Sequence, residues 1–248
     1  EGLEFEQQDG VYVVTGYHGT DVDIIIPDTY NDVPVAIIGE SCFEDSDIQS
    51  VTVGNNIEII EDYAFRYASL LKDVSLPASL REIGTSCFRD CVSLKKVSFA
   101  KNCMLETIDD MAFDGCENLN AINLPDQLTY IRIRAFSGCT SLKSLEIPAS
   151  VSCVNRDAFS GFTSEQKIII HGSTEGWDNG SSTYVFDSEY ATIDVSWNAG
   201  CDAEIIYKDS DFTSPSASGN ATSEDIPTNK NSLLGTFDRI FGTNISSI

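Results

Sequence analysis

The chain has 248 residues and a formal net charge of −24, which arises from 39 acidic and 15 basic side chains. Nucleic acids and anionic membrane surfaces are bound mainly through lysine and arginine, so this balance excludes both as expected partners and predicts a well-solvated exterior. No apolar run approaches the length of about 18 residues that a membrane-spanning helix needs, so we predict no membrane insertion within this chain.

The acidic charge is unevenly distributed. Residues 35–171 carry 19 acidic and 12 basic side chains, a net charge of −7, whereas the remainder carries 20 and 3, a net charge of −17. The chain starts at Glu1 without a methionine or a basic and apolar leader. This start is typical of a mature or truncated chain from which an export signal has been removed.

Residues 1–34 are predicted to form a β-rich N-terminal cap. The runs Val11–Val14 and Ile24–Ile26 are rich in β-branched residues and are separated by Gly16, Gly19 and Asp21, a pattern typical of strands joined by turns. Such a cap is expected because the first unit of a repeat array would otherwise expose its core.

Phenylalanine recurs at nearly constant spacing through residues 35–172. The steps between successive phenylalanines are 22, 23, 25, 23 and 23 residues, and each phenylalanine follows an alanine or a cysteine. The six are Phe43, Phe65, Phe88, Phe113, Phe136 and Phe159. A fixed period of this length indicates a solenoid whose coils contact only their neighbours. We therefore predict about six coils over residues 35–172.

Aliphatic residues keep the same register as the phenylalanines. The fifth and eighth residues before each phenylalanine are aliphatic, and the segment after it follows the pattern L-x-x-[VIL]-x-[LIF], ended by Pro77, Pro125 or Pro148 in three units. This pattern predicts a short strand with one buried face that stops at a turn. Coils stacked about 4.8 Å apart would join these side chains into a continuous core. The single 25-residue step places its extra residues at Ala100–Met104, which we predict to be a surface turn.

These units resemble the bacterial leucine-rich repeats called BspA-like, whose unit is approximately L-x-x-[IV]-x-[IL]-P-x-x-[LV]-x-x-I-G-x-x-[AC]-F-x-x-C. Leu70–Cys91 matches this unit almost throughout and Leu142–Phe159 matches well, while the similarity as a whole extends over Val11–Gly172. The glycine of the family unit is replaced at four places, which leaves the turn shape there open: Glu61, Asp109, Arg132 and Asn155.

The resemblance implies an α/β-type repeat, namely a right-handed leucine-rich-repeat solenoid with one short parallel strand per coil and β-rich N- and C-terminal caps. It also implies a secreted or surface-displayed protein of bacteria or of some parasites, with an adhesive role in several members of the family. It does not identify a ligand.

Five of the eight cysteines occupy repeat positions, as alanine replacements before a phenylalanine or three residues after one: Cys42, Cys87, Cys91, Cys116 and Cys139. Their phase predicts small, buried, free thiols. A structural zinc site is not expected, because no C-x-x-C pair occurs and the only histidines are His18 and His171. A disulfide that involves Cys103, Cys153 or Cys201 remains open.

The C-terminal quarter departs from the period. Lys167–Ile170 is predicted to be the last strand of the array, and Ala191–Val195 and Ala203–Tyr207 are predicted strands of a C-terminal β-rich cap over residues 173–208. Residues 209–248 are predicted to be a flexible, acidic, Ser/Thr-rich linker that contains a short amphipathic helix near its end. This helix could dock on the array, begin a further domain or bind a partner.

No catalytic signature is present. Walker A, dinucleotide-binding, nucleophile-elbow and zincin motifs are all missing, and His18 and His171 lie on opposite flanks of the array. A glycosidase would need two carboxylates in a cleft, and the acidic pairs at Asp21–Asp23 and Asp209–Asp211 lack the glycine and glutamate of a calcium loop. We therefore expect no enzymatic activity, no cofactor and no metal ion.

The outward residues of the predicted strands form the candidate ligand-binding surface, called the strand face below. Most are small and polar, and three lysines share one register. The candidates are Lys72, Asp73, Ser75, Lys95, Lys96, Ser98, Asn120, Asn123, Lys143, Ser144 and Glu146. The alternative is that they are ordinary solvated side chains, because scattered surface charge rarely has a specific role.

The expected function is binding of host or matrix proteins by a non-enzymatic secreted or cell-surface protein. One alternative is a structural spacer that displays another domain, which the linker favours. Another is a glycan-binding module, for which aromatic rings of the C-terminal region could supply stacking surfaces: Trp177, Tyr184, Tyr190, Trp197 and Tyr207. Large aromatics in a strand-rich segment more often pack the end of a core, however.

Overall fold

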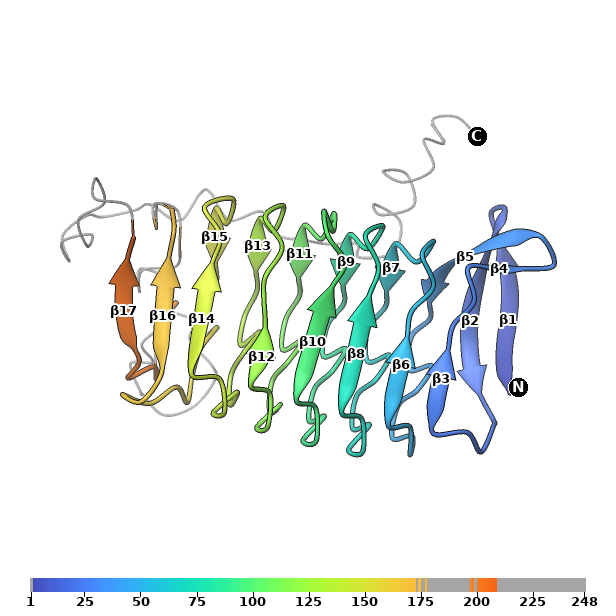
Figure 1. The fold of residues 1–248 in the computed structure, drawn as a ribbon, viewed down its shortest axis with the longest axis horizontal. Helices are drawn as coiled ribbons and strands as arrows, with labels where there is room; N and C mark the ends of the chain where they lie inside the picture. Colours follow the sequence, from blue (N-terminus) through green and yellow to red (C-terminus); the bar gives the residue numbers. More distant parts are fainter. Residues whose placement is uncertain (1, 173, 175–176, 178–196, 199, 209–248) are drawn as a thin grey trace, which may run out of the picture. The chain divides into compact units, whose positions relative to one another are not determined.

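The computed structural model describes residues 2–172, 174, 177, 197–198 and 200–208. All of them belong to one compact unit, Glu1–Ala217, and a second unit comprises Ser218–Ile248. The predicted strand Ala191–Val195 and the predicted linker and helix in residues 209–248 lie outside the described residues. Within these residues the chain winds into a solenoid of short strands and turns (Figure 1).

The first row of strands contains the predicted repeat strands. It forms a five-stranded parallel sheet in the order β12-β10-β8-β6-β3 and a three-stranded parallel sheet in the order β14-β16-β17. The strands are β3 (Asp23–Ile25), β6 (Ser50–Thr52), β8 (Asp73–Leu76), β10 (Lys96–Phe99), β12 (Ala121–Ile122), β14 (Ser144–Ile147), β16 (Lys167–Ile170) and β17 (Glu204–Tyr207). Exposed and buried residues alternate along β8 and β14, which confirms the prediction of one buried face.

A second row of strands accompanies the first (Figure 1). Its parallel members are β2 (Val11–Tyr17), β5 (Val33–Ile38), β7 (Ile59–Ile60), β9 (Glu82–Ile83), β11 (Thr107–Ile108), β13 (Tyr130–Ile131) and β15 (Cys153–Val154). The strands β1 (Leu3–Gln8) and β4 (Thr29–Tyr30) join it in antiparallel pairs. The sequence indicated this row only as an aliphatic ladder, because two-residue strands are too short to show a period of two.

The predicted α/β character is wrong, since no helix occurs among the described residues. Residues two before and two after each phenylalanine have positive φ, as Ser86 (52°) and Asp90 (56°) do around Phe88. An α-helix needs consecutive right-handed residues, so a left-handed residue every fourth position excludes it. The amides instead bond between coils, for example from Phe88 N–H to Ala112 C=O at 2.8 Å. Each phenylalanine therefore lies in a turn, and we call this series of turns the phenylalanine arc.

The turn is preserved where the family glycine is missing. Gly84 N–H donates to Ile60 C=O at 2.8 Å, and the four replacing residues make the equivalent bond to the preceding coil at 2.9–3.0 Å. None of the four has a positive φ. The φ angle at this position therefore does not require glycine, and the backbone hydrogen bond of the repeat is kept at Glu61, Asp109, Arg132 and Asn155.

The six phenylalanine rings form a continuous stack. Successive centroids are 5.0, 5.0, 5.2, 5.4 and 6.1 Å apart, with interplanar angles of 2–15°. Tyr17 closes one end at 5.9 Å, and Trp197 contacts Phe159 edge-on at 6.1 Å at the other. The stack is buried throughout and belongs to a single hydrophobic core.

The C-terminal end of the array agrees with the prediction in one respect and differs in another. The predicted strand Ala203–Tyr207 is present as β17. β17 pairs with β16 in parallel, from Lys167 opposite Glu204 to Ile170 opposite Tyr207, so Lys167–Ile170 is not the last strand of the row. The phenylalanine period has ended by then, but Trp197 takes over the contact with Phe159 and Ile205 packs against the core. Strand pairing thus continues one step beyond the sequence period.

All five repeat-position cysteines are buried free thiols, as predicted. Three of them donate their S–H to the carbonyl oxygen of a phenylalanine in the neighbouring coil, with Sγ–O distances of 3.0 Å from Cys91, 3.0 Å from Cys116 and 3.2 Å from Cys139. Burial raises the pKa of the Cys42 thiol to about 12 and raises that of Cys91 further. Cys103, Cys153 and Cys201 form no disulfide either, so none of the bridges left open above is present among the described residues.

We predict that Phe113→Ala destabilises the protein more than Phe5→Ala. Phe113 is fully buried between two stacked rings, so its truncation leaves a cavity and should cost about 3–5 kcal/mol. Phe5 is only partly buried and packs on Tyr30 at the N-terminal edge. Urea unfolding measures the stability of both variants. Equal unfolding midpoints would contradict the view that the phenylalanine stack stabilises the fold.

We also predict that Cys91, Cys116 and Cys139 resist alkylation in the native state. Burial keeps the reagent away from these thiols and, by raising their pKa, suppresses the reactive thiolate form. The half-buried Cys153 and Cys201 should react first, and all eight should react in denaturant. Mass spectrometry of alkylated peptides identifies the sites. Rapid labelling of these three thiols in the native protein would contradict their placement in the core.

Candidate functional site

The strand face is built by the outward residues of the first row. Asp73 lies between Ser50 and Lys96 in Cα register, and Ser75 lies between Thr52 and Ser98. Their side chains point outward because residues of a strand alternate between its two faces, and the other face is buried. Adjacent coils thus place these polar side chains in rows about 4.8 Å apart.

The lysines of the strand face also lie in one register. Lys95 N–H donates to Lys72 C=O at 2.8 Å, and Asn120 N–H donates to Lys95 C=O at 3.0 Å. Lys72 Nζ donates to Gln49 Oε1 at 2.7 Å. Lys95 and Lys96 are exposed and make no ion pair with any described residue. Their ammonium groups are therefore available to solvent or to a partner.

The structure divides the predicted site into two parts. β12 has two residues and no pairing with β14, so the strands from β3 to β12 form one sheet and those from β14 to β17 another. Lys143, Ser144 and Glu146 belong to the second part. There Lys143 Nζ lies 4.0 Å from Glu165, and Glu146 accepts a hydrogen bond from, or pairs with, His171 Nε2 at 3.0 Å. The remaining candidates lie on or beside the first sheet.

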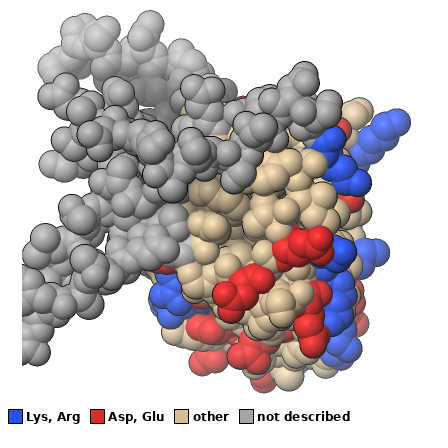
Figure 2. Space-filling view, turned by 90° about the vertical axis from the view of Figure 1, so that its left-hand side faces the viewer, with Lys and Arg blue, Asp and Glu red and all other residues tan. Residues whose placement is uncertain are grey.

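Charge is segregated on the described surface. In Figure 2, which looks at the end of the solenoid that carries β17, most visible basic side chains line the right-hand edge, whereas acidic ones lie across the lower part. That edge corresponds to the front of Figure 1, where the first row of strands runs. In this view, the edge that carries the strand face is therefore the more basic part of the visible described surface.

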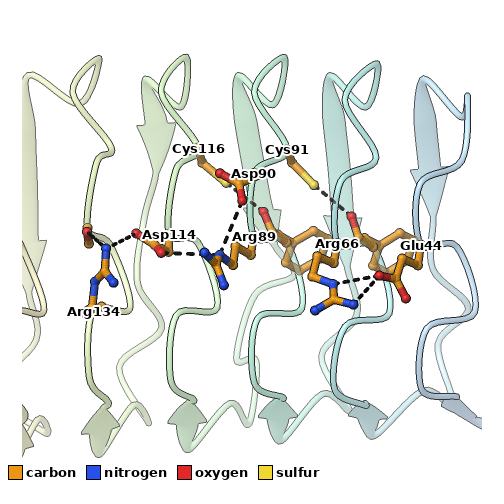
Figure 3. Close-up of polar contacts among 11 residues, drawn as sticks. Glu44, Arg66, Arg89, Asp90, Cys91, Asp114, Cys116 and Arg134 are labelled. Carbon is orange, nitrogen blue, oxygen red and sulfur yellow. Dashed lines mark hydrogen bonds and ion pairs between the residues drawn. The ribbon is translucent and has the colours of Figure 1, made fainter. Parts of the chain in front are cut away.

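Ion pairs connect neighbouring coils along the phenylalanine arc (Figure 3). Arg66 forks onto Glu44 of the preceding coil, and its guanidinium lies 4.2 Å from the ring centroid of Tyr63. Asp114, whose side chain is 9% exposed, lies 3.6 Å from Arg89 and 3.5 Å from Arg134. Sequence reasoning missed these pairs, although the residue after each of the first four phenylalanines is charged, with acidic Glu44 and Asp114 on either side of basic Arg66 and Arg89. These ion pairs link neighbouring coils. We assign them a structural role and no catalytic one.

Half-buried carboxylates form a second polar feature beside the arc. Asp62 Oδ1 accepts from Thr85 N–H at 2.7 Å, and Asp110 Oδ1 accepts from Ile133 N–H at 3.0 Å, each in the next coil. Burial raises the pKa of both carboxyls, and the charge of neighbouring Asp109 raises each of them further. Among the described residues, no three His, Cys, Asp or Glu side chains are grouped to hold a metal ion.

Each histidine lies beside a carboxylate. His18 Nε2 lies 3.6 Å from Glu4, and His171 pairs with Glu146 as described above. No described residue provides a nucleophile within reach of either ring. Within the described part of the chain, no helix has the length and hydrophobicity required to cross a membrane.

Two of the aromatic residues considered for sugar stacking pack the core instead. Trp177 and Trp197 are 4% and 7% exposed, and their rings meet edge-on at 5.0 Å. Tyr207 is partly buried against the same core. Tyr184 and Tyr190 lie outside the described residues.

Parallel strand rows, a phenylalanine stack and a 22–25-residue period define a leucine-rich-repeat solenoid. The chain belongs to the BspA type leucine rich repeat family, whose model matches six copies over residues 23–105 and 106–196. No curated protein matches the chain.

Two solved structures share this fold. A leucine rich repeat protein of T. pallidum is 23% identical, with a TM-score of 0.61 over 68% of this chain and 78% of that one. A leucine rich cell surface protein of Faecalibacterium prausnitzii A2-165 is 24% identical, with a TM-score of 0.54 over 70% of this chain. The matched region spans about half of the latter protein, 54% of its length.

We predict that acidification from about pH 7 to about pH 5 stabilises the fold. The pKa values of the Asp62 and Asp110 carboxyls are raised in the folded protein, so the folded state binds their protons more tightly than the unfolded state does. Their contribution to folding stability therefore grows as the pH falls toward the pKa of the unfolded state. It is lost as the pH rises through the pKa of the folded state. The double variant Asp62→Asn with Asp110→Asn keeps a side-chain oxygen that can accept from the backbone N–H of Thr85 and of Ile133. It should raise the free energy of unfolding at pH 7 and make that free energy depend less on pH. Urea unfolding at several pH values measures this.

The matched control is Asp47→Asn with Asp73→Asn, which removes the same charge from exposed positions. If the control flattens the pH dependence equally, general charge repulsion explains the effect and the half-buried Asp62 and Asp110 do not.

Proposed function

We propose that this protein is a secreted or cell-surface adhesin of the BspA-type family that binds protein partners through its strand face, without enzymatic activity. The observation that carries the proposal is the row of exposed lysines, of which Lys95 and Lys96 make no ion pair with any described residue on a chain of net charge −24. A partner with an acidic segment would find these ammonium groups on a rigid, flat surface. The surface location of the F. prausnitzii protein supports the same location for this chain.

The repeat explains why recognition would reside there. Core positions must be apolar in every coil, so only outward residues are free to differ between proteins of this fold. Polar, lysine-containing interfaces gain specificity and association rate from charge complementarity rather than from buried area. Such a surface suits attachment to host or matrix proteins.

A spacer role is the second candidate. Backbone hydrogen bonds run from coil to coil along the whole arc and the ring stack is continuous, which makes the array a stiff rod. A glycan-binding role loses support, because Trp177 and Trp197 are buried in the core.

The test replaces Lys72, Lys95, Lys96 and Lys143 by glutamine and measures attachment of the purified protein to cells and to matrix proteins. We expect weaker attachment with an unchanged fold, and a larger loss at low salt because exposed charges interact within a Debye length of about 8–10 Å.

The matched control makes the same change in net charge away from the strand face, with glutamate at four exposed positions: Gln7, Gln8, Ser69 and Ser164. Weakening by both variants would indicate a nonspecific charge effect. Wild-type attachment by the lysine variant, together with loss of attachment on removal of residues 209–248, would make the array a spacer and the proposed binding role wrong.

A further inference from the structure

The one coil with a 25-residue step forms a groove. The extra residues Ala100–Met104 follow β10, and the segment Asn123–Gln127 follows β12 in the next coil (Figure 1). Between them lies a cavity of about 630 Å³, which Arg81 and Glu106 also line. Ligand sites of proteins commonly have volumes of about 300–1,000 Å³. The inserted residues therefore line a concavity of binding size on the described surface.

The wall of this groove is held in place by its own contacts. Met104 N–H donates to Ala78 C=O at 2.9 Å, and Cys103 N–H donates to Ala100 C=O at 3.2 Å. Cys103 is buried, whereas the Met104 side chain is 38% exposed beside the cavity. The loop thus presents an apolar, unbranched side chain without needing to reorganise.

The pairing between β10 and β12 ends early beside the groove. In the preceding coil the Leu76 carbonyl accepts from Ala100 N–H at 2.9 Å, as the Ile147 carbonyl does from His171 N–H at 3.1 Å. At Phe99 the equivalent donor position is Pro125, which has no N–H. β12 pairs with β10 only at Lys96 and Val97. The backbone beside the groove therefore carries a carbonyl for which the repeat supplies no donor.

The remaining groups favour a ligand that is both apolar and basic. Phe99 and Leu124 are partly buried and form an apolar surface with Met104. Asp126 is exposed and makes no ion pair with any described residue, while Glu106 shares Arg81 with Glu58. The lining thus holds two basic side chains, Arg81 and Lys101, and two acidic ones, Glu106 and Asp126. Because Glu58 and Glu106 both pair with Arg81, its charge is already balanced and Asp126 is left to attract a cation.

We propose that this groove binds an extended segment of a partner protein in which a lysine or arginine stands next to a bulky apolar residue. The apolar side chain packs on Met104 and Leu124, the cation faces Asp126, and a main-chain N–H of the segment reaches the Phe99 carbonyl. Extended peptides bind by this combination of main-chain bonds and alternating pockets. The inference rests on the proposed function only in taking a protein as the partner.

The experiment selects random decapeptides displayed on phage against the full chain and synthesises the enriched sequences. We expect a basic residue adjacent to an apolar one in these peptides. Met104→Ser with Asp126→Asn should weaken their binding about tenfold, through lost apolar contact and a lost exposed charge pair. The matched control, Leu70→Ser with Asp47→Asn, changes similarly exposed residues elsewhere and should bind as wild type.

A second readout locates the bound peptide. The chain has two methionines, so ¹³C-methyl labelling gives two assignable signals. The Met104 signal should shift and saturate with added peptide, and the Met111 signal, from a residue of the phenylalanine arc outside the groove lining, should not.

The outcomes separate this inference from the proposed function. Absence of enrichment, enrichment without the basic–apolar pair, or unchanged binding by the groove variant would each overturn the groove proposal. Peptides that lose binding to the strand-face glutamine variant but not to the groove variant would also overturn it, while leaving the strand-face proposal standing.

Discussion

Hydrogen bonding between the backbones of successive coils is the constraint on which the rest of this structure depends. Along the phenylalanine arc, every second amide donates to the next coil, as Phe65 does to Cys87 and Phe88 to Ala112, each at 2.8 Å. Left-handed residues on both sides of each phenylalanine aim the amides along the axis of the array. Because this bonding fixes the coil spacing, equivalent side chains must stack on one another.

Stacking in register explains the composition of the core. Equivalent positions of successive coils lie one above the other, so the six phenylalanine rings stack with nearly parallel planes. Small thiols fill the position three residues later and donate to phenylalanine carbonyls, which satisfies polar atoms that would otherwise be costly to bury. Carboxylates such as Asp62 and Asp110 perform a related task at the edge of the arc, where they accept amides from the next coil.

The same constraint determines which positions can differ between proteins of this fold. Outward residues of the first strand row are free to vary, and here they include exposed lysines. Departures from the period act differently, because they change the backbone path of a coil instead of one side chain. The longer step at Ala100–Met104, together with the missing N–H of Pro125, interrupts strand pairing and opens a groove. A recognition surface in this fold can therefore arise either from the repeat or from its interruption.

The sequence by itself determined the period, the buried ladders, the phase of the cysteines and the place of the insertion, because each coil repeats the same local pattern. It did not determine that Ser86 and Asp90 adopt left-handed conformations that replace a helix by a turn, nor that β17 pairs with β16 after the phenylalanine period ends. The pairing of Arg66 with Glu44, the burial of Trp177 and Trp197, and the groove were likewise decided only by the tertiary structure. All of these depend on neighbours more than 20 residues away in the chain, and a local pattern does not specify contacts across that separation.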